Sequence, residues 1–207
     1  MESCCGHDVK FDGLSHAYRR VLWIVIAINA AMFFTEMFAG FAAQSQALKA
    51  DALDFLGDTL TYGASLAVIG RPIALRSRVA SIKGWSLAAM GAWVLGYTFY
   101  EVFVFGLPDA PTMGIIGFLA LAANVASVLL LMRYRDGDAN VRSVWLCSRN
   151  DAIGNVAVMG AALAVGLTAS PWPDLIVAAV MASLFLYSAV QILAQASGER
   201  KEALAAE

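Results

Sequence analysis

The stretch ADALDFLGD at residues 50–58 places three aspartates at the start of a segment that otherwise reads as a membrane-spanning helix, because TLTYGASLAVI follows it directly. One aspartate at the centre of a spanning helix costs about 2.5–3.5 kcal/mol on insertion scales. Charged residues inside a spanning segment are therefore rare, and those that occur usually have a function.

The composition around this stretch is that of an integral membrane protein. The chain has 207 residues, 60% of them hydrophobic, and its mean hydropathy is +0.68, whereas an average soluble domain is about 45–50% apolar. A helix needs about 20 apolar residues to cross the hydrocarbon layer. Six runs meet this requirement, at residues 21–43, 47–69, 85–105, 112–132, 144–167 and 175–195.

The predicted fold is all-α, a polytopic membrane protein with six transmembrane helices and short loops. Residues 1–20 are expected to form an N-terminal tail that contains cysteine and histidine, residues 21–195 the six-helix domain, and residues 196–207 a short C-terminal tail. Basic residues cluster in both tails and in the second and fourth loops, whereas Lys49 is the only cation on the opposite side. The positive-inside rule therefore predicts that both termini are cytoplasmic.

Two pairs of potential metal ligands lie within these spans. Asp54 and Asp58 are four residues apart, as are Cys147 and Asp151, so each pair shares one helix face. If the two helices are adjacent, three carboxylates and one thiolate converge, a set that suits Zn²⁺ and Cd²⁺. We predict a metal site at these residues. The alternative is that they line an aqueous cavity or lie near the interface without binding anything.

The third aspartate, Asp51, lies nearly a turn away from the face that Asp54 and Asp58 share. We expect it to take part in capping and packing at the start of its helix.

The segments that carry these ligands resemble a known family. SQALKADALDFLGD and NVRSVWLCSRNDAIGNV are similar to the second and fifth spans of the cation diffusion facilitator family, whose members export Zn²⁺ and related ions in exchange for protons. In this resemblance Asp54, Asp58 and Asp151 take ligand positions, and Cys147 stands where the family usually has histidine. Glu36 and Gly40 match the E-x-x-x-G motif of the family's first span.

The resemblance covers essentially the whole chain and implies a homodimeric antiporter in the cell's inner membrane. Its partners would be the divalent metal ion, transported as Zn²⁺ and also Cd²⁺, and protons. The thiol of Cys147 favours these ions over Mn²⁺, which prefers oxygen ligands. The family usually continues into a cytoplasmic ferredoxin-like domain, and because this chain stops at Glu207 we expect a short form without it.

Further residues have alternative roles. Cys4, Cys5 and His7 near the N-terminus would collect metal at the entrance, or belong to a disordered tail. Asn155 lies one turn beyond Asp151 and would extend the ligand path, or pack between helices through its amide.

Arg149 lies inside the fifth predicted span, next to the proposed ligands. A cation there opposes metal binding unless it faces elsewhere. We expect a structural ion pair with Glu36, Glu101 or Asp51 that fixes the rotation of the helix, rather than a direct role in transport.

The sequence does not indicate an enzyme. It contains no phosphate-binding glycine loop and no nucleophile with a base partner, and no nucleic-acid partner is expected. A metal ligand must lose its proton to bind the ion, so metal and protons compete, and a proton gradient would supply the work. The alternatives are a membrane-embedded metal sensor or buffer, and a proton-coupled exporter of organic cations, which would not need Cys147.

Overall fold

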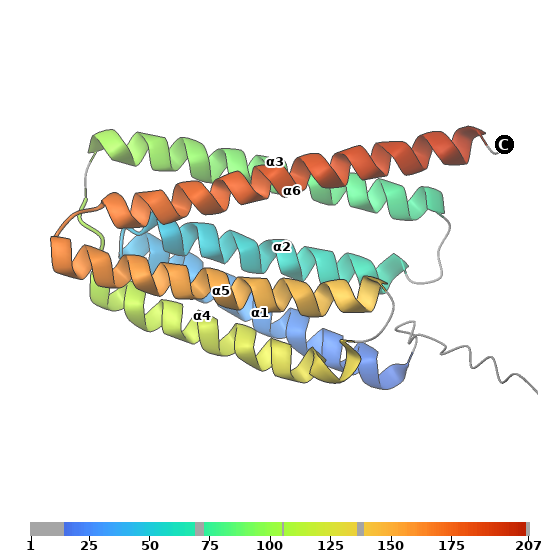
Figure 1. Cartoon of the computed structure of the whole chain (residues 1–207), viewed down its shortest axis with the longest axis horizontal. Helices are drawn as coiled ribbons and strands as arrows, with labels where there is room; N and C mark the ends of the chain where they lie inside the picture. Colours follow the sequence, from blue (N-terminus) through green and yellow to red (C-terminus); the bar gives the residue numbers. More distant parts are fainter. Residues whose placement is uncertain (1–14, 69–72, 105, 136–138, 206–207) are drawn as a thin grey trace, which may run out of the picture.

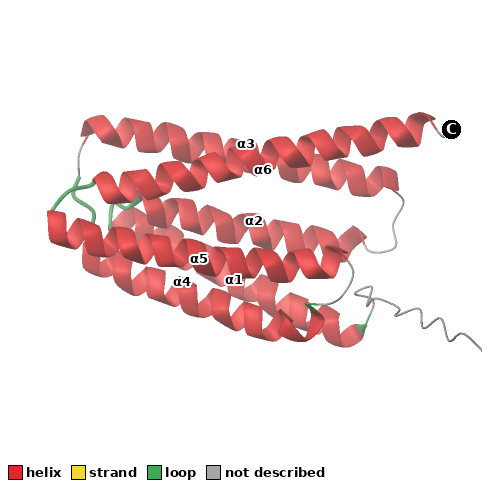
Figure 2. Cartoon of the chain, in the orientation of Figure 1, coloured by secondary structure: helices red, strands yellow, loops and turns green. Residues whose placement is uncertain are grey.

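The computed structural model describes residues 15–68, 73–104, 106–135 and 139–205. This part of the chain is helical and contains no strand. The elements are α1 (His16–Ala42), α2 (Gln46–Val68), α3 (Ile73–Val104), α4 (Ala110–Leu131), the short 3₁₀-helix η1 (Met132–Tyr134), α5 (Ala139–Thr168) and α6 (Trp172–Ala205). Figure 2 shows long helices joined by short loops. The prediction of an all-α polytopic protein is confirmed.

Four segments among the described residues are long and apolar enough to cross a membrane, namely His16–Ala42, Ala110–Tyr134, Ser148–Thr168 and Trp172–Gly198. α2 falls short of this criterion because it carries Lys49, Asp51, Asp54 and Asp58. α3 is rich in tryptophan, tyrosine and glycine, residues whose hydropathy is low. Both nevertheless run alongside the other helices, so the six predicted spans correspond to six helices.

The helices run lengthwise in one bundle, with α3 and α6 side by side along one edge (Figure 1). The other close pairs are α4 with α5 and α1 with α2. α2 is central, since it contacts α1, α3, α5 and α6. α1 begins and α6 ends at the same end of the bundle, and α2 and α5 are in contact with each other.

The turns at the opposite end are tied together by hydrogen bonds. Asp174, in the first turn of α6, accepts from the Ser45 hydroxyl at 2.6 Å and from the backbone N–H groups of Gln46 and Ala47 at 2.7 and 3.1 Å. The N–H of Asp109, just before α4, donates to the carbonyl of Ala43 at 2.9 Å. These bonds satisfy donors at the start of α2 that have no partner within the helix, so this end of the bundle is closed by polar contacts.

The packing is inverted relative to a soluble protein. Large apolar side chains face outward, as Phe38 (76% exposed) and Leu167 (78% exposed) do. The interior combines small and apolar residues with buried polar ones, including Glu36, Asp51, Asn124 and Asn155. Apolar surface toward lipid and polar groups toward the bundle interior is the arrangement expected of membrane helices.

Candidate metal site

Three of the four predicted ligands meet where α2 and α5 run side by side (Figure 1). Asp54 and Asp58 lie one turn apart on α2, and the carboxyl of Asp151 on α5 interacts with both of them. All three side chains are partly buried. The four-residue spacing within α2 and the contact between the two helices thus bring three carboxyl groups to one point.

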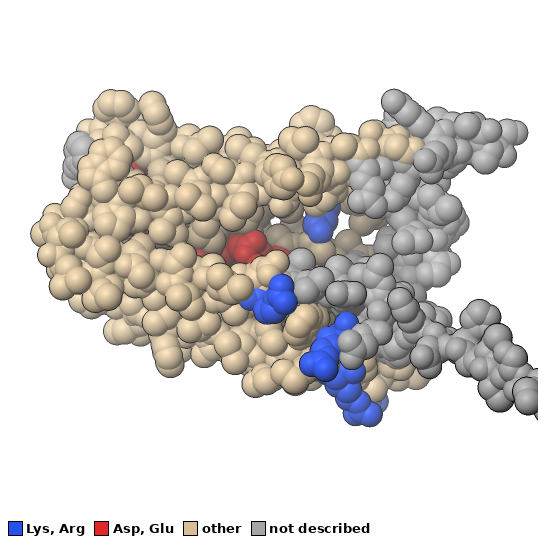
Figure 3. Space-filling model, in the orientation of Figure 1, with Lys and Arg blue, Asp and Glu red and all other residues tan. Residues whose placement is uncertain are grey.

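The three aspartates are not fully buried. Figure 3 shows acidic side-chain atoms in a hollow near the middle of one face, with basic side chains only on the side toward the end where α1 begins. Of the basic residues, Lys83 on α3 is near enough to Asp58 to interact with it electrostatically. A cation that enters the hollow would therefore meet negative charge at its floor.

Tyr62 supports Asp58 and was not identified from the sequence. Its hydroxyl donates to the carboxylate of Asp58, one turn earlier on α2. The same oxygen lies 3.4 Å from the carbonyl of Val144 and 3.4 Å from the hydroxyl of Ser148, both on α5. The phenol thereby fixes the orientation of Asp58 and links it to the neighbouring helix. The sequence signal for this role of Tyr62 is its position four residues after Asp58.

The fourth predicted ligand, Cys147, lies on α5, but its side chain is outside the described residues. Among the side chains that the structure does describe, no three histidine, cysteine, aspartate or glutamate residues are arranged to hold a metal ion by themselves. Asp54, Asp58 and Asp151 alone therefore do not form a metal site in this structure, and a site that combines them with Cys147 stays a prediction.

Asn155 does not extend this group, because its amide is already engaged. Its Nδ2 donates to Asp51 at 2.7 Å, and its Oδ1 accepts from Asn124 at 2.9 Å. This arrangement matches the alternative in which the amide packs between helices. Asp51 does not cap α2 as expected from the sequence. It faces Asn155 and Glu36 instead, and the capping role belongs to Asp174.

The predicted ion pair between Arg149 and Glu36 is absent from the described residues. Arg149 is exposed, and its guanidinium lies 5.4 Å from the ring centroid of Trp145 and 3.4 Å from the side-chain oxygen of Asn150. Glu36 is fully buried. The cation thus faces outward from the proposed ligands, as the sequence argument required, but stacking on an aromatic ring takes the place of an ion pair.

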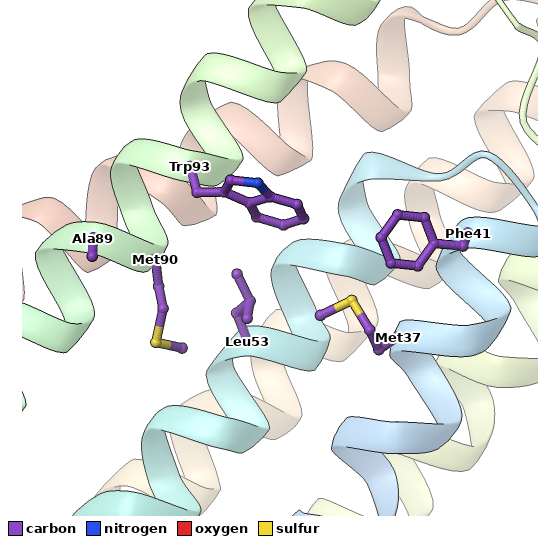
Figure 4. Close-up of a pocket in the computed structure, with 6 residues that line it drawn as sticks. All are labelled: Met37, Phe41, Leu53, Ala89, Met90 and Trp93. Atoms are coloured by element: carbon purple, nitrogen blue, oxygen red, sulfur yellow. The ribbon is translucent and has the colours of Figure 1, made fainter.

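Two other features lie apart from the aspartates. Cys4, Cys5 and His7 fall outside the described residues. A cavity of about 410 Å³ between α1, α2 and α3 (Figure 4) has an apolar lining, made up of Met37, Phe41, Leu53, Ala89, Met90 and Trp93. This lining offers no oxygen ligand.

The chain is similar to known proteins of one family. The model of the cation efflux transmembrane domain matches residues 77–198, a range that includes Asp151 but not Asp54 and Asp58. The chain is 28% identical over 206 residues (93% of the chain, 63% of the relative) to the metal cation efflux system protein CzcD of Cupriavidus metallidurans. It is 27% identical over 190 residues (85% of the chain, 58% of the relative) to the cation efflux system protein CzcD of an Alcaligenes species. The chain therefore spans less than two thirds of the length of these curated relatives.

Proposed function

The chain belongs to the cation diffusion facilitator (cation efflux) family, and on that premise we propose that it exports Zn²⁺ or Cd²⁺ in exchange for protons. The ion would be held by Asp54, Asp58, Cys147 and Asp151. The observation that carries this proposal is the meeting of the α2 and α5 aspartates, in which Asp151 interacts with both Asp54 and Asp58.

The chemistry of these groups supports exchange rather than permanent binding. Three carboxyl groups in contact repel one another unless a cation or protons compensate their charge. A metal ion binds them only in their deprotonated form, so protons displace it when their concentration rises. The three aspartates are only partly buried, which leaves both kinds of ion a way to reach them.

The proposed cycle follows from these two properties. We propose that both termini lie in the cytoplasm, that the cell's inner membrane holds the protein, and that the site loads metal from inside. Rocking of the helices would then expose the site to the other face, where protons displace the ion. The functional unit proposed here is a homodimer, and Cys4, Cys5 and His7 are proposed to collect metal at the entrance.

Zinc uptake into inside-out vesicles with an imposed pH gradient tests this function. Asp54→Asn and Asp151→Asn should abolish the gradient-dependent uptake, whereas Asp109→Asn, an exposed helix cap remote from the site, should retain it. Uptake that survives both site variants would refute the assignment of the ligands. Stoichiometric zinc binding without uptake would indicate a sensor or buffer, and uptake of organic cations alone would indicate the other class of exporter.

The thiol gives a sharper test of metal choice. Thiolate ligands favour soft ions, and imidazole is a harder ligand. Cys147→His should therefore lower the ratio of Cd²⁺ to Zn²⁺ transport while zinc transport persists. An unchanged ratio would show that the thiol does not contact the ion.

A further inference from the structure

A second pair of carboxyl groups lies inside the bundle. Glu36 on α1 is 0% exposed and Asp51 on α2 is 1% exposed. The two carboxyl groups lie within hydrogen-bonding reach of each other. Two ionised carboxylates at such a separation would repel strongly, and burial removes the water that would screen them.

Within the part of the chain that the structure describes, no hydrogen-bond donor reaches either carboxylate oxygen of Glu36. A buried charge without a partner is among the most costly groups in a protein. The neighbouring Asp51, in contrast, accepts a hydrogen bond from Asn155 at 2.7 Å. Asn155 is held in turn by the amide of Asn124 on α4 at 2.9 Å. Asp51 therefore has a donor that stabilises its ionised form. Glu36 has none, so it is the carboxyl group that protonation would stabilise.

The charges around the pair do not compensate it. α1 packs chiefly against α2 and α4, and Glu36 is the only charged residue between Arg20 and Lys49. α4 contains no charged residue. From α2, Asp54 adds further negative charge near Glu36.

Two cations on α2 and α5, the helices that carry Asp51 and Asn155, are directed elsewhere. The ammonium of Lys49 lies 4.7 Å from the ring centroid of Phe41 and 4.8 Å from that of Tyr97. Arg149 on α5 is exposed and stacks on Trp145. Neither cation neutralises the pair, so its charge must be balanced by something that binds between the two carboxyl groups.

We propose that Glu36 and Asp51 form a binding site for one proton, which Glu36 carries and donates to Asp51, separate from the proposed metal ligands. A single proton turns two repelling anions into a carboxylic acid and a carboxylate joined by a charge-assisted hydrogen bond. Asn155 fixes which oxygen accepts it. The site is defined in the metal-free protein, so it does not depend on the transport activity proposed above.

The position of the pair connects it to both metal-bearing helices. Asp51 precedes Asp54 by three residues on α2, and Asn155 follows Asp151 by four residues on α5. A movement of α5 relative to α2 would break the Asn155–Asp51 hydrogen bond and change the affinity of the carboxyl pair for the proton.

Infrared spectroscopy of the full chain in lipid nanodiscs, without metal, tests the proposal. A buried protonated carboxyl group gives a carbonyl stretch that is distinct from the carboxylate bands and shifts in heavy water. The difference spectrum between wild type and Glu36→Gln should contain this band, whereas Asp51→Asn, which replaces the accepting carboxylate by an amide, should shift its frequency. Asn155→Ala should move its frequency. Glu101→Gln and Asp109→Asn, which change carboxyl groups elsewhere, should leave it unchanged.

Glutamine and asparagine retain size and a donor group, and size-exclusion chromatography verifies that each variant is folded. The proposal is overturned if the wild type lacks the band at every pH at which it is folded. It is also overturned if the band persists in folded Glu36→Gln, or if its frequency is the same in wild type and in folded Asp51→Asn. A band that responds to replacement of sodium by choline at constant pH would assign the site to a monovalent metal ion and overturn it as well.

Discussion

Aspartates have opposite roles in two regions of the bundle, namely where α2 meets α5 and at the closed end where α6 begins. Between α2 and α5, Asp54 and Asp151 are partly exposed and meet other carboxyl groups. At the closed end, Asp174 is fully buried and accepts three hydrogen bonds from the start of α2. The difference lies in the supply of donors. An aspartate whose oxygens are saturated by donors is a structural anchor, whereas one that faces other carboxyl groups depends on an exchangeable cation or proton.

Of the changes considered, removal of the Asp174 carboxylate should lower the stability of the protein most. Asp174→Ala leaves the Ser45 hydroxyl and the N–H groups of Gln46 and Ala47 without their buried acceptor. The expected loss is about 3 kcal/mol, because hydrogen bonds to a charged acceptor are worth more than neutral ones. Thermal unfolding of the purified protein in detergent measures it.

The matched control is Asp109→Ala, which removes the exposed N-cap of α4. An exposed cap is worth about 1 kcal/mol, so the decrease in melting temperature should be clearly smaller. Equal decreases for the two variants would show that burial of Asp174 adds nothing to its role as a cap. Asp174 would then not be a special structural anchor.

The fold follows from the lengths of the apolar runs, but the helix ends do not. Each predicted span matches one helix over all but at most one of its residues, yet α3 begins at Ile73, well before residue 85, and α6 continues to Ala205, well past residue 195. Polar residues that favour helix, such as those in GERKEALA, extend these helices past the apolar runs. Hydrophobicity sets what crosses the membrane, and it does not set where a helix stops.

In the candidate site, too, some features follow from the local sequence and others depend on how the helices pack. Spacing within one helix predicts that Asp54 and Asp58 share a face, since this depends only on helix geometry. The approach of Glu36 to Asp51 depends on how α1 is rotated against α2, and the anchoring of α2 by Asp174 joins residues 127 or more positions apart. Neither is encoded in a local pattern. Arg149 was misassigned for the same reason, because its direction follows from the rotation of α5.

The close approach of α1 and α2 at the closed end gives a second prediction. A Cβ added at Gly40 would lie 2.9 Å from Cγ of Lys49 and 3.1 Å from its backbone nitrogen. Lys49 cannot move aside easily, since two aromatic rings hold its ammonium. Gly40→Ala should destabilise the protein by about 1–3 kcal/mol through overpacking, as measured by thermal unfolding.

Gly160→Ala is the control for Gly40→Ala. Gly160 is an exposed position of α5 with no neighbour within 4 Å of the added Cβ. Alanine favours a helix over glycine by up to about 1 kcal/mol, so this variant should be neutral or slightly more stable. Similar losses at both positions would mean that helix packing at Gly40 is not the cause.

The third prediction concerns the region where α2 meets α5. Tyr62→Phe removes the hydroxyl that donates to Asp58 and keeps the buried ring. If Asp58 binds metal, loss of this support should weaken zinc affinity about tenfold, the lower end of the range for residues that orient a ligand. Isothermal titration calorimetry of wild type and variant provides the comparison. Tyr187→Phe, at an exposed position on α6, should have no effect, and unchanged affinity in Tyr62→Phe would argue that Asp58 needs no orientation.

The smallest effect is expected where Lys49 meets its two rings at the closed end. Tyr97→Leu removes one of these rings, at 4.8 Å from the ammonium, and leaves Phe41 at 4.7 Å. A cation–π contact of this kind is worth about 0.5–1 kcal/mol, more when desolvated, so the melting temperature should fall slightly. Tyr97→Phe keeps the ring and should match the wild type. If the phenylalanine variant loses as much as the leucine variant, the hydroxyl rather than the ring is responsible. Lys49 would then depend on a hydrogen-bonded polar group, as the buried Asp174 does, and not on aromatic rings.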